Sequence, residues 1–109
     1  MIYEFCAENV TLLEKAMQAG ARRIELCDNL AVGGTTPSYG VTKAAVELAA
    51  DYDTTIMTMI RPRGGDFVYN DLEISIMLDD IRLTAQAGSQ GVVFGALTAD
   101  KKLDKANLE

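Results

Sequence analysis

The sequence has 109 residues, of which 49% are apolar and 24% are charged, and this composition is typical of one compact domain with a buried core. Its net charge of -6 and the lack of a broad basic stripe argue against a nucleic-acid partner, and no apolar run is long enough to span a bilayer. The amino end has no basic, cleavable leader, which predicts a cytoplasmic protein, and its two cysteines are then expected to be thiols rather than a disulfide. The sequence contains no histidine, so the commonest metal ligand is missing.

The first part of the sequence alternates between strand and helix patterns. Residues Ile2 to Cys6 alternate with period two and predict a strand. Apolar residues at helical spacing then predict a helix from Val10 to Ala19, which Gly20 ends. Arg23 to Cys27 repeat the strand pattern, so a second strand is expected there.

Both predicted strands carry a glutamate two residues before a terminal cysteine, Glu4 with Cys6 and Glu25 with Cys27. Side chains two apart in a strand share a face, so each pair is expected to point the same way. In an ordinary half-buried strand that face is solvated. In a closed parallel barrel it would instead line the interior and its mouth.

A polar loop from Asp28 to Ser38 contains the pair Gly33-Gly34. Paired glycines ahead of a helix can form a nest of backbone N–H groups for an anion, but they are also common in turns for conformational reasons. Both interpretations stay open here. The helix that follows is expected to bury one face, with Val41, Ala44, Ala45 and Leu48.

A third strand, about Thr54 to Ile60, leads into the segment Arg61-Pro62-Arg63-Gly64-Gly65-Asp66-Phe67. One interpretation is an anion site, in which a carboxylate or phosphate is held by Arg61, Arg63 and the Gly64-Gly65 backbone. Glu4 or Glu25 would then act as general acid or base, with Arg61 a third catalytic candidate. The alternative is structural: Arg61 pairs with Glu4, Glu25 or Asp66, and Arg63 and Asp66 order the loop.

The remaining sequence predicts one more helix and one more strand. Asn70 begins the helix, with Glu73 placed as in a capping box, and Gly88 ends it. Its buried stripe is expected at Ile74, Met77, Leu78, Ile81 and Ala85. Gly91 to Gly95 read as an apolar parallel strand, Ala96 to Asp104 as a loop, and Lys105 as the start of another helix.

Regular alternation of strands and helices with short connections requires a parallel sheet with right-handed crossovers. Two architectures fit. One is a TIM (β/α)8 barrel, of which this sequence supplies about the first four β/α units; the other is a small open parallel α/β sheet. A barrel needs roughly 250 residues, and the sequence stops within a predicted helix. We therefore expect residues 1–109 to be the amino-terminal half of a single barrel domain.

Four motifs in this order and spacing resemble the CutC copper homeostasis family: Arg23-Ile24-Glu25-Leu26-Cys27, Gly33-Gly34-Thr35-Thr36-Pro37-Ser38-Tyr39-Gly40, Arg61-Pro62-Arg63-Gly64-Gly65-Asp66-Phe67 and Gly91-Val92-Val93-Phe94-Gly95. They span nearly the whole sequence. The resemblance implies a cytoplasmic single-domain TIM barrel that binds or traffics copper and assembles as a homo-oligomer, a dimer or a tetramer.

The resemblance directs attention to sulfur ligands, because Cu(I) is soft and prefers thiolate and thioether donors. Cys6 and Cys27, at the predicted ends of neighbouring strands, could reach one Cu(I) ion. Met57 and Met59 are weaker candidates on the next strand. The simpler alternative is that buried cysteines and methionines fill the core.

Three kinds of function therefore remain open from the sequence. The first is copper binding or trafficking at the carboxyl ends of the barrel strands. The second is an enzyme or binding protein for a small anionic metabolite, a phosphate or a carboxylate, at the same place. The third is an oligomeric scaffold with no chemistry of its own.

Overall fold

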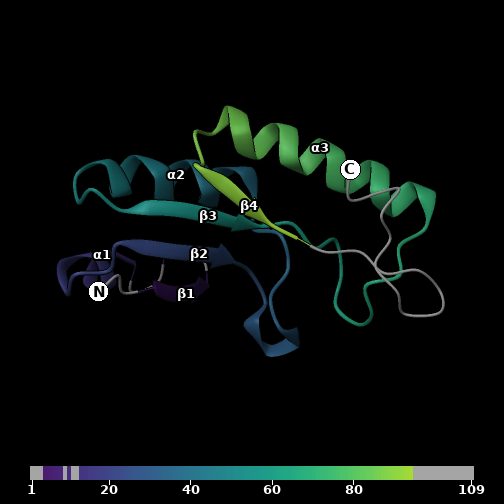
Figure 1. Cartoon of the computed structure of the whole chain (residues 1–109), viewed down its shortest axis with the longest axis horizontal. Coiled ribbons are helices and arrows are strands. Elements are labelled where there is room, and N and C mark those ends of the chain that lie inside the picture. Colours follow the sequence, from purple (N-terminus) through teal and green to yellow (C-terminus); the bar gives the residue numbers. More distant parts are fainter. Residues whose placement is uncertain (1–3, 9, 11–12, 95–109) are drawn as a thin grey trace.

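The computed structural model describes residues 4–8, 10 and 13–94, with side chains for all of these except residues 4 and 5. Four strands lie in this part of the chain: β1 (Glu4–Glu8), β2 (Arg23–Cys27), β3 (Thr55–Met59) and β4 (Gly91–Val93). The helices are α1 (Leu13–Gln18), α2 (Tyr39–Ala50), α3 (Asp71–Gln86) and the short 3-10 helix η1 (Leu30–Val32) (Figure 1).

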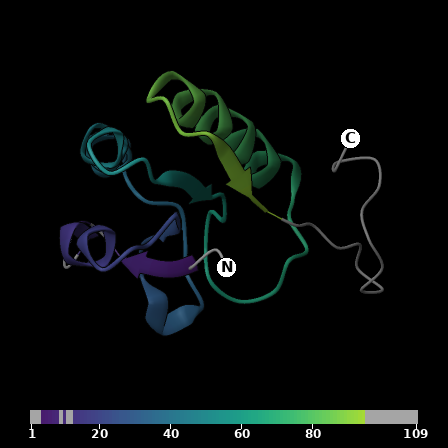
Figure 2. The same cartoon turned by 60° about the vertical axis from the view of Figure 1, so that its left-hand side comes forward.

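The strands form one parallel sheet in the order β1-β2-β3-β4, so every strand pairs with its neighbour in sequence. With right-handed crossovers, this order places all connecting helices on one face of the sheet. Figure 2 shows this arrangement, with α1, α2 and α3 in an outer arc around the strands. We call the face away from the helices the inner face.

The hydrophobic core lies between the sheet and the helices. Ile24, Leu26 and Ile56 are fully buried on the helix side of the strands. Each such burial stabilises the fold by roughly 1.5–3 kcal/mol. They pack against apolar side chains of α1, α2 and the turn after α1: Leu13, Met17, Ala21, Ala45 and Ala49.

The strand and helix limits differ from the predicted ones mainly at the start of the chain. β1 ends at Glu8, not at Cys6, because Ala7 and Glu8 continue the pairing with β2. α1 begins at Leu13, and Val10 lies in a turn that accepts the Leu13 N–H at 3.2 Å. β4 ends at Val93. The predicted strand residues Ile2, Tyr3 and Gly95, the loop from Ala96 and the helix from Lys105 lie outside the described residues.

The buried faces of the two longer helices, α2 and α3, also differ from the predicted ones. In α2 the buried residues are Thr42, Ala45 and Ala49, while Ala44 is exposed. In α3 they are Met77 and Thr84, whereas Leu78 is 54% exposed and Ala85 is also exposed. α3 packs mainly against α2 and β4, so the flanks of its apolar stripe stay uncovered by the described residues. No helix within 13–94 is long and apolar enough to cross a membrane.

Candidate functional site at the strand ends

The inner face of the sheet carries three rows of residues, because every second residue of a strand belongs to it, and the first row is formed by Glu4, Arg23 and Thr55. In the middle row Cys6 pairs with Glu25, Glu25 with Met57, and Met57 with Gly91. In the terminal row Glu8 pairs with Cys27, and Met59 pairs with Val93. Because Leu26 pairs with Thr58, the same register brings Cys27 level with Met59.

Cys27 ends β2 and is 1% exposed, although it points away from the helix-side core. Its Sγ donates a weak hydrogen bond to the Ala7 carbonyl at 3.6 Å. Burial raises the pKa of the Cys27 thiol to about 11, and the neighbouring acidic groups Cys6, Glu25, Glu8 and Asp28 add to the increase. The thiol is therefore protonated at neutral pH, and a metal must displace its proton.

Cys6 does not lie at the end of its strand, as the sequence predicted, but in the middle row of β1. It is exposed, and it sits one row below Cys27 on the adjacent strand. The two cysteines share a face and influence each other electrostatically, but Glu8, not Cys6, is level with Cys27. A metal held by both would bind diagonally across β1 and β2.

The two methionines of β3 have different surroundings. A Cβ at Gly34 would lie 3.4 Å from Cys27 Sγ and 3.7 Å from Met59 Cε, so both side chains border the same glycine. Met57 instead leans over Gly91, where a Cβ would lie 2.9 Å from its Sδ. Met59 is thus the thioether beside Cys27. Among the side chains described, no three or more His, Cys, Asp or Glu residues gather as a hard metal site would require.

Arg61 is 7% exposed, and its guanidinium group binds protein carbonyls. Nη1 donates to Val32 O at 2.7 Å and to Gly34 O at 3.0 Å, while Nη2 donates to Gly65 O at 2.8 Å. The group also stacks 4.8 Å from the Phe67 ring centroid. Within residues 13–94 it pairs with no carboxylate, so the predicted ion pairs with Glu25 and Asp66 are wrong; the Glu4 side chain is not described.

The glycines predicted to form an anion nest make protein contacts instead. Gly33 N donates to Leu30 O at 2.9 Å and Gly34 N to Asn29 O at 3.2 Å, so neither amide remains for a ligand. Both glycines have left-handed φ values of 89° and 97°. A Cβ at Gly33 would approach Arg61 Nη1 to 3.0 Å, which means that the guanidinium group needs a glycine there.

Arg63 belongs to the loop in front of α3. Its guanidinium group pairs with Glu73 through Nε and with Asp66 through Nη2 at 3.3 Å, and it donates to Val68 O at 2.7 Å. The hydrogen bond from Arg63 lowers the pKa of Glu73. The prediction that Arg63 and Asp66 order this loop is confirmed. Of the glycines beside them, Gly64 lies against Val32, where a Cβ would come within 3.1 Å, and Gly65 provides a carbonyl to Arg61.

Two residues near the site were missed by the sequence reasoning. Glu8 lies level with Cys27, and its Oε1 accepts the Leu30 N–H at 2.7 Å. Thr36 Oγ1 accepts the Arg61 N–H at 2.8 Å and donates to Arg61 O at 3.2 Å. The period-two pattern Glu4, Cys6, Glu8 could have indicated Glu8, whereas the partner of Thr36 depends on tertiary structure. Glu25, the other acid–base candidate, is partly buried in the middle row.

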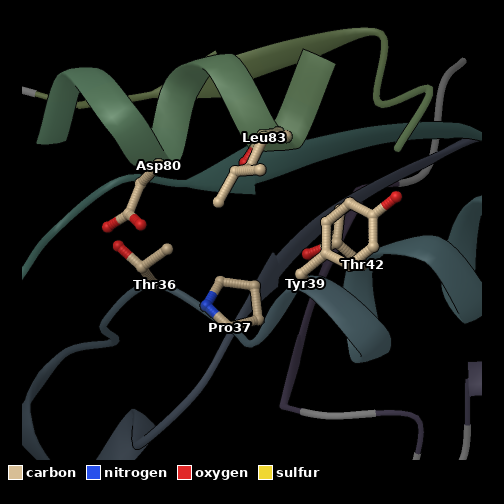
Figure 3. A pocket seen from close by; sticks show the side chains of 7 residues that line it. Thr36, Pro37, Tyr39, Thr42, Asp80 and Leu83 are labelled. Atoms are coloured by element: carbon tan, nitrogen blue, oxygen red, sulfur yellow. The ribbon is translucent and has the colours of Figure 1, made fainter. Parts of the chain in front are cut away.

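A small cavity lies on the outer side of the molecule, between α2, α3 and the chain leading into α2 (Figure 3). Asp80 and Thr36 face each other across it. Burial, followed by the charge of Asp79, raises the pKa of Asp80. The cavity volume is about 30 Å³, which is room for little more than a water molecule. This cavity is therefore too small for a metabolite.

Comparisons with known proteins agree with the motifs. The model of the CutC family matches residues 1–109. A CutC family protein of Streptococcus pyogenes serotype M6 is 57% identical over all 109 residues, and the human copper homeostasis protein cutC homolog is 47% identical over 104 residues. The matches cover 52% and 37% of those proteins, so the chain spans about half the length of the Streptococcus relative and less of the human one.

A crystal structure of CutC from Streptococcus agalactiae superposes with a TM-score of 0.95 and 49% identity, covering 99% of this chain and 51% of that one. The sheet with its outer helices is accordingly the first half of a TIM barrel, which confirms the barrel prediction over the open sheet. The match over the full sequence shows that this chain belongs to the CutC family.

Proposed function

We propose that the protein binds Cu(I) as its cargo on the inner face of the barrel, with Cys27 and Cys6 as thiolate ligands, and acts in copper homeostasis by binding or trafficking the ion. One observation carries the proposal. All four sulfur atoms of β1, β2 and β3 that point to the inner face, those of Cys6, Cys27, Met57 and Met59, occupy two adjacent rows.

The donor set fits a soft metal and not a hard one. Thiolate and thioether sulfur select Cu(I), whereas zinc in structural sites takes four ligands and calcium takes six or more oxygens. The protonated Cys27 thiol also fits a cargo site, since the ion has to displace a proton on binding and is released when the proton returns. The names of the relatives point in the same direction.

The proposal is tested by anaerobic titration of the reduced protein with Cu(I) in competition with a chromophoric Cu(I) chelator. We expect about one Cu(I) per chain, and no binding that competes with the chelator in the Cys6→Ser, Cys27→Ser double variant. Glu25→Gln is the matched control, because Glu25 lies between the sulfur residues of the middle row but offers only oxygen. Unchanged stoichiometry in the double variant would sink the proposal.

A small anion is the second candidate ligand, and one observation favours it. Arg61 Nε and the Tyr69 hydroxyl are both buried and close enough to interact with each other, and neither has a hydrogen-bond partner of ordinary geometry in the described part of the chain. A carboxylate or phosphate oxygen could accept from both. Phosphate or acetate should then raise the melting temperature of the protein but not of its Tyr69→Phe variant. Equal shifts for the two proteins, or no shift at all, would remove this candidate.

We further propose a cytoplasmic location and a homo-oligomeric assembly. A reducing compartment keeps Cys27 in the thiol form that the site needs. Exposed apolar side chains on α3, among them Leu72, Leu78 and Leu83, provide surface that a further part of the protein or another copy can cover. Sedimentation of the purified protein tests the assembly, and fractionation of cells tests the location.

A further inference from the structure

We infer that Arg61 positions residues 28–36 as a strap over the Cys27 thiol, and so controls how fast reagents and metal reach that sulfur. The inference rests in part on the proposed function, because Cu(I) is one of the species that must pass the strap. The contact between the strap and the thiol follows from the distances in the structure and does not depend on copper binding.

The strap is a closed loop that leaves the carboxyl end of β2. Its ends are joined by two backbone hydrogen bonds, Asp28 N to Thr35 O at 2.9 Å and Thr35 N to Asp28 O at 2.7 Å. Figure 1 shows it, with η1 at its tip, leaving the sheet on the same side as the chain after β3. Glu8 holds it to β1 through the Leu30 N–H.

Gly34 is the point at which the strap covers the thiol. Because a Cβ on Gly34 would lie 3.3 Å from Cys27 Cβ and 3.4 Å from its Sγ, the backbone of the strap rests directly on the cysteine. Cys27 is 1% exposed, although it belongs to the inner face of the sheet. A reagent that approaches Cys27 from this face therefore meets Gly34 and Met59 first.

Arg61, in the segment that follows β3, holds the strap in place. Its Nη1 binds the carbonyls of Val32 and Gly34, which lie on the two sides of Gly33, and its Nη2 binds Gly65 on the other loop. Its backbone is tied to Thr36 at the end of the strap. The Arg61 side chain thus bonds directly to the glycine that covers Cys27, in addition to the backbone hydrogen bonds of the strap. We conclude that the guanidinium group has a positioning role toward the thiol.

The test is the rate at which N-ethylmaleimide, an uncharged reagent, modifies Cys27 in a Cys6→Ser background, with and without Arg61→Met. Charge-assisted hydrogen bonds are among the stronger ones in proteins, so losing three of them should raise the labelling rate about tenfold or more. Loss of a nearby cation by itself would not increase the thiolate fraction of Cys27, but opening the strap would relieve the burial that raises the pKa of this thiol. A faster rate therefore reports uncovering of the thiol, through greater access and a lower pKa together.

Arg63→Met is the matched control. Its guanidinium group binds Glu73, Asp66, Val68 and Gly64, and none of these hydrogen bonds reaches a residue of the strap. We expect Cys27 labelling within about twofold of the Cys6→Ser parent for this variant. Labelling at increasing urea concentrations distinguishes opening of the strap from destabilisation of the whole protein. Opening of the strap exposes little surface, so the labelling rate should hardly change at low urea. Labelling through global unfolding should instead become steeply faster.

If Arg61→Met does not fold, Phe67→Leu replaces it, since the Phe67 ring only supports the guanidinium group from one side. The inference would be overturned if Cys27 in the Arg61 or Phe67 variant were labelled at the rate of the parent protein. It would also be overturned if the labelling rate increased only in step with global unfolding in urea. Cu(I) uptake forms a separate arm, in which the Arg61 variant should load faster with unchanged stoichiometry. If no variant binds Cu(I), the proposed function fails, while the labelling rates still decide the role of the strap.

Discussion

Cys27 and Met59 end neighbouring parallel strands on the same face of the sheet, and both border Gly34, with Cys27 Sγ 3.4 Å and Met59 Cε 3.7 Å from the position of a Cβ on that glycine. This brings a thioether beside the buried thiol. Met57, one row lower, leans over Gly91 instead. The two methionines therefore offer a matched pair for testing which sulfur belongs to the metal site.

Met59→Leu should lower the affinity for Cu(I) by about tenfold while the thiolate ligands keep the stoichiometry, because leucine fills similar volume but has no donor atom. Met57→Leu should change the affinity by less than about twofold. Competition with a Cu(I) chelator measures both. Equal losses in the two variants would mean that the ion does not sit next to Gly34.

The affinity for Cu(I) should depend on pH. The pKa of Cys27 is raised to about 11, so the folded protein holds this proton tightly and the metal has to displace it. The apparent affinity should consequently rise by at least about tenfold for each pH unit between about pH 6 and pH 8. A pH-independent affinity would show that Cys27 does not bind the ion as a thiolate. Titrations in Cys27→Ser provide the control, because the dependence should there be weaker by about tenfold for each pH unit, with only Cys6 left to release a proton.

The capping box of α3 supplies a prediction about stability. Asn70 Oδ1 accepts the Glu73 N–H at 2.8 Å, and Glu73 Oε1 accepts the Asn70 N–H at 3.1 Å. Asn70→Ala should lower the free energy of unfolding by about 1 kcal/mol, and Asn70→Asp should preserve most of it because aspartate also caps well. Urea unfolding measures the change. Equal stability of Asn70→Ala and the parent protein would show that the cap contributes nothing measurable.

The open sheet makes a prediction about residues 1–109 expressed alone. β1 and β4 each pair with one strand only among those described, which leaves the outer edge of each without a partner there. Unpaired edges promote association. Sedimentation velocity should therefore show concentration-dependent self-association. A monomer that unfolds cooperatively would contradict the view that these residues are half of one domain.

Local sequence signals predicted the parts of the fold that local interactions determine. β2 has the predicted limits, Arg23 to Cys27, and the capping box of α3 is formed by Asn70 and Glu73 as predicted. Both features depend only on residues that are close in sequence. The end of β1 was missed, because Glu8 belongs to the strand through its pairing with Cys27. The buried stripe of α3 was only partly right, since burial depends on which elements lie beside the helix.

The candidate site shows the same limit. The sequence placed Cys6, Cys27, Arg61 and the glycine pair at the strand ends, and the structure keeps all of them there except Cys6, which lies in the middle of β1. It did not predict that Arg61 would bind carbonyls of a loop some 30 residues earlier, because that contact exists only once two strands have paired. The chemistry of the arginine alone suggested an anion, whereas in the structure its Nη atoms bind loop carbonyls and only Nε is left for a ligand.

The most direct test of the central claim is X-ray absorption at the copper edge of the Cu(I)-loaded protein, compared with the Cys6→Ser, Cys27→Ser variant. The account predicts sulfur as the nearest-neighbour atom of the ion in the parent protein and loss of bound copper in the variant. A first shell of nitrogen or oxygen only, or an unchanged sulfur shell in the variant, would contradict it.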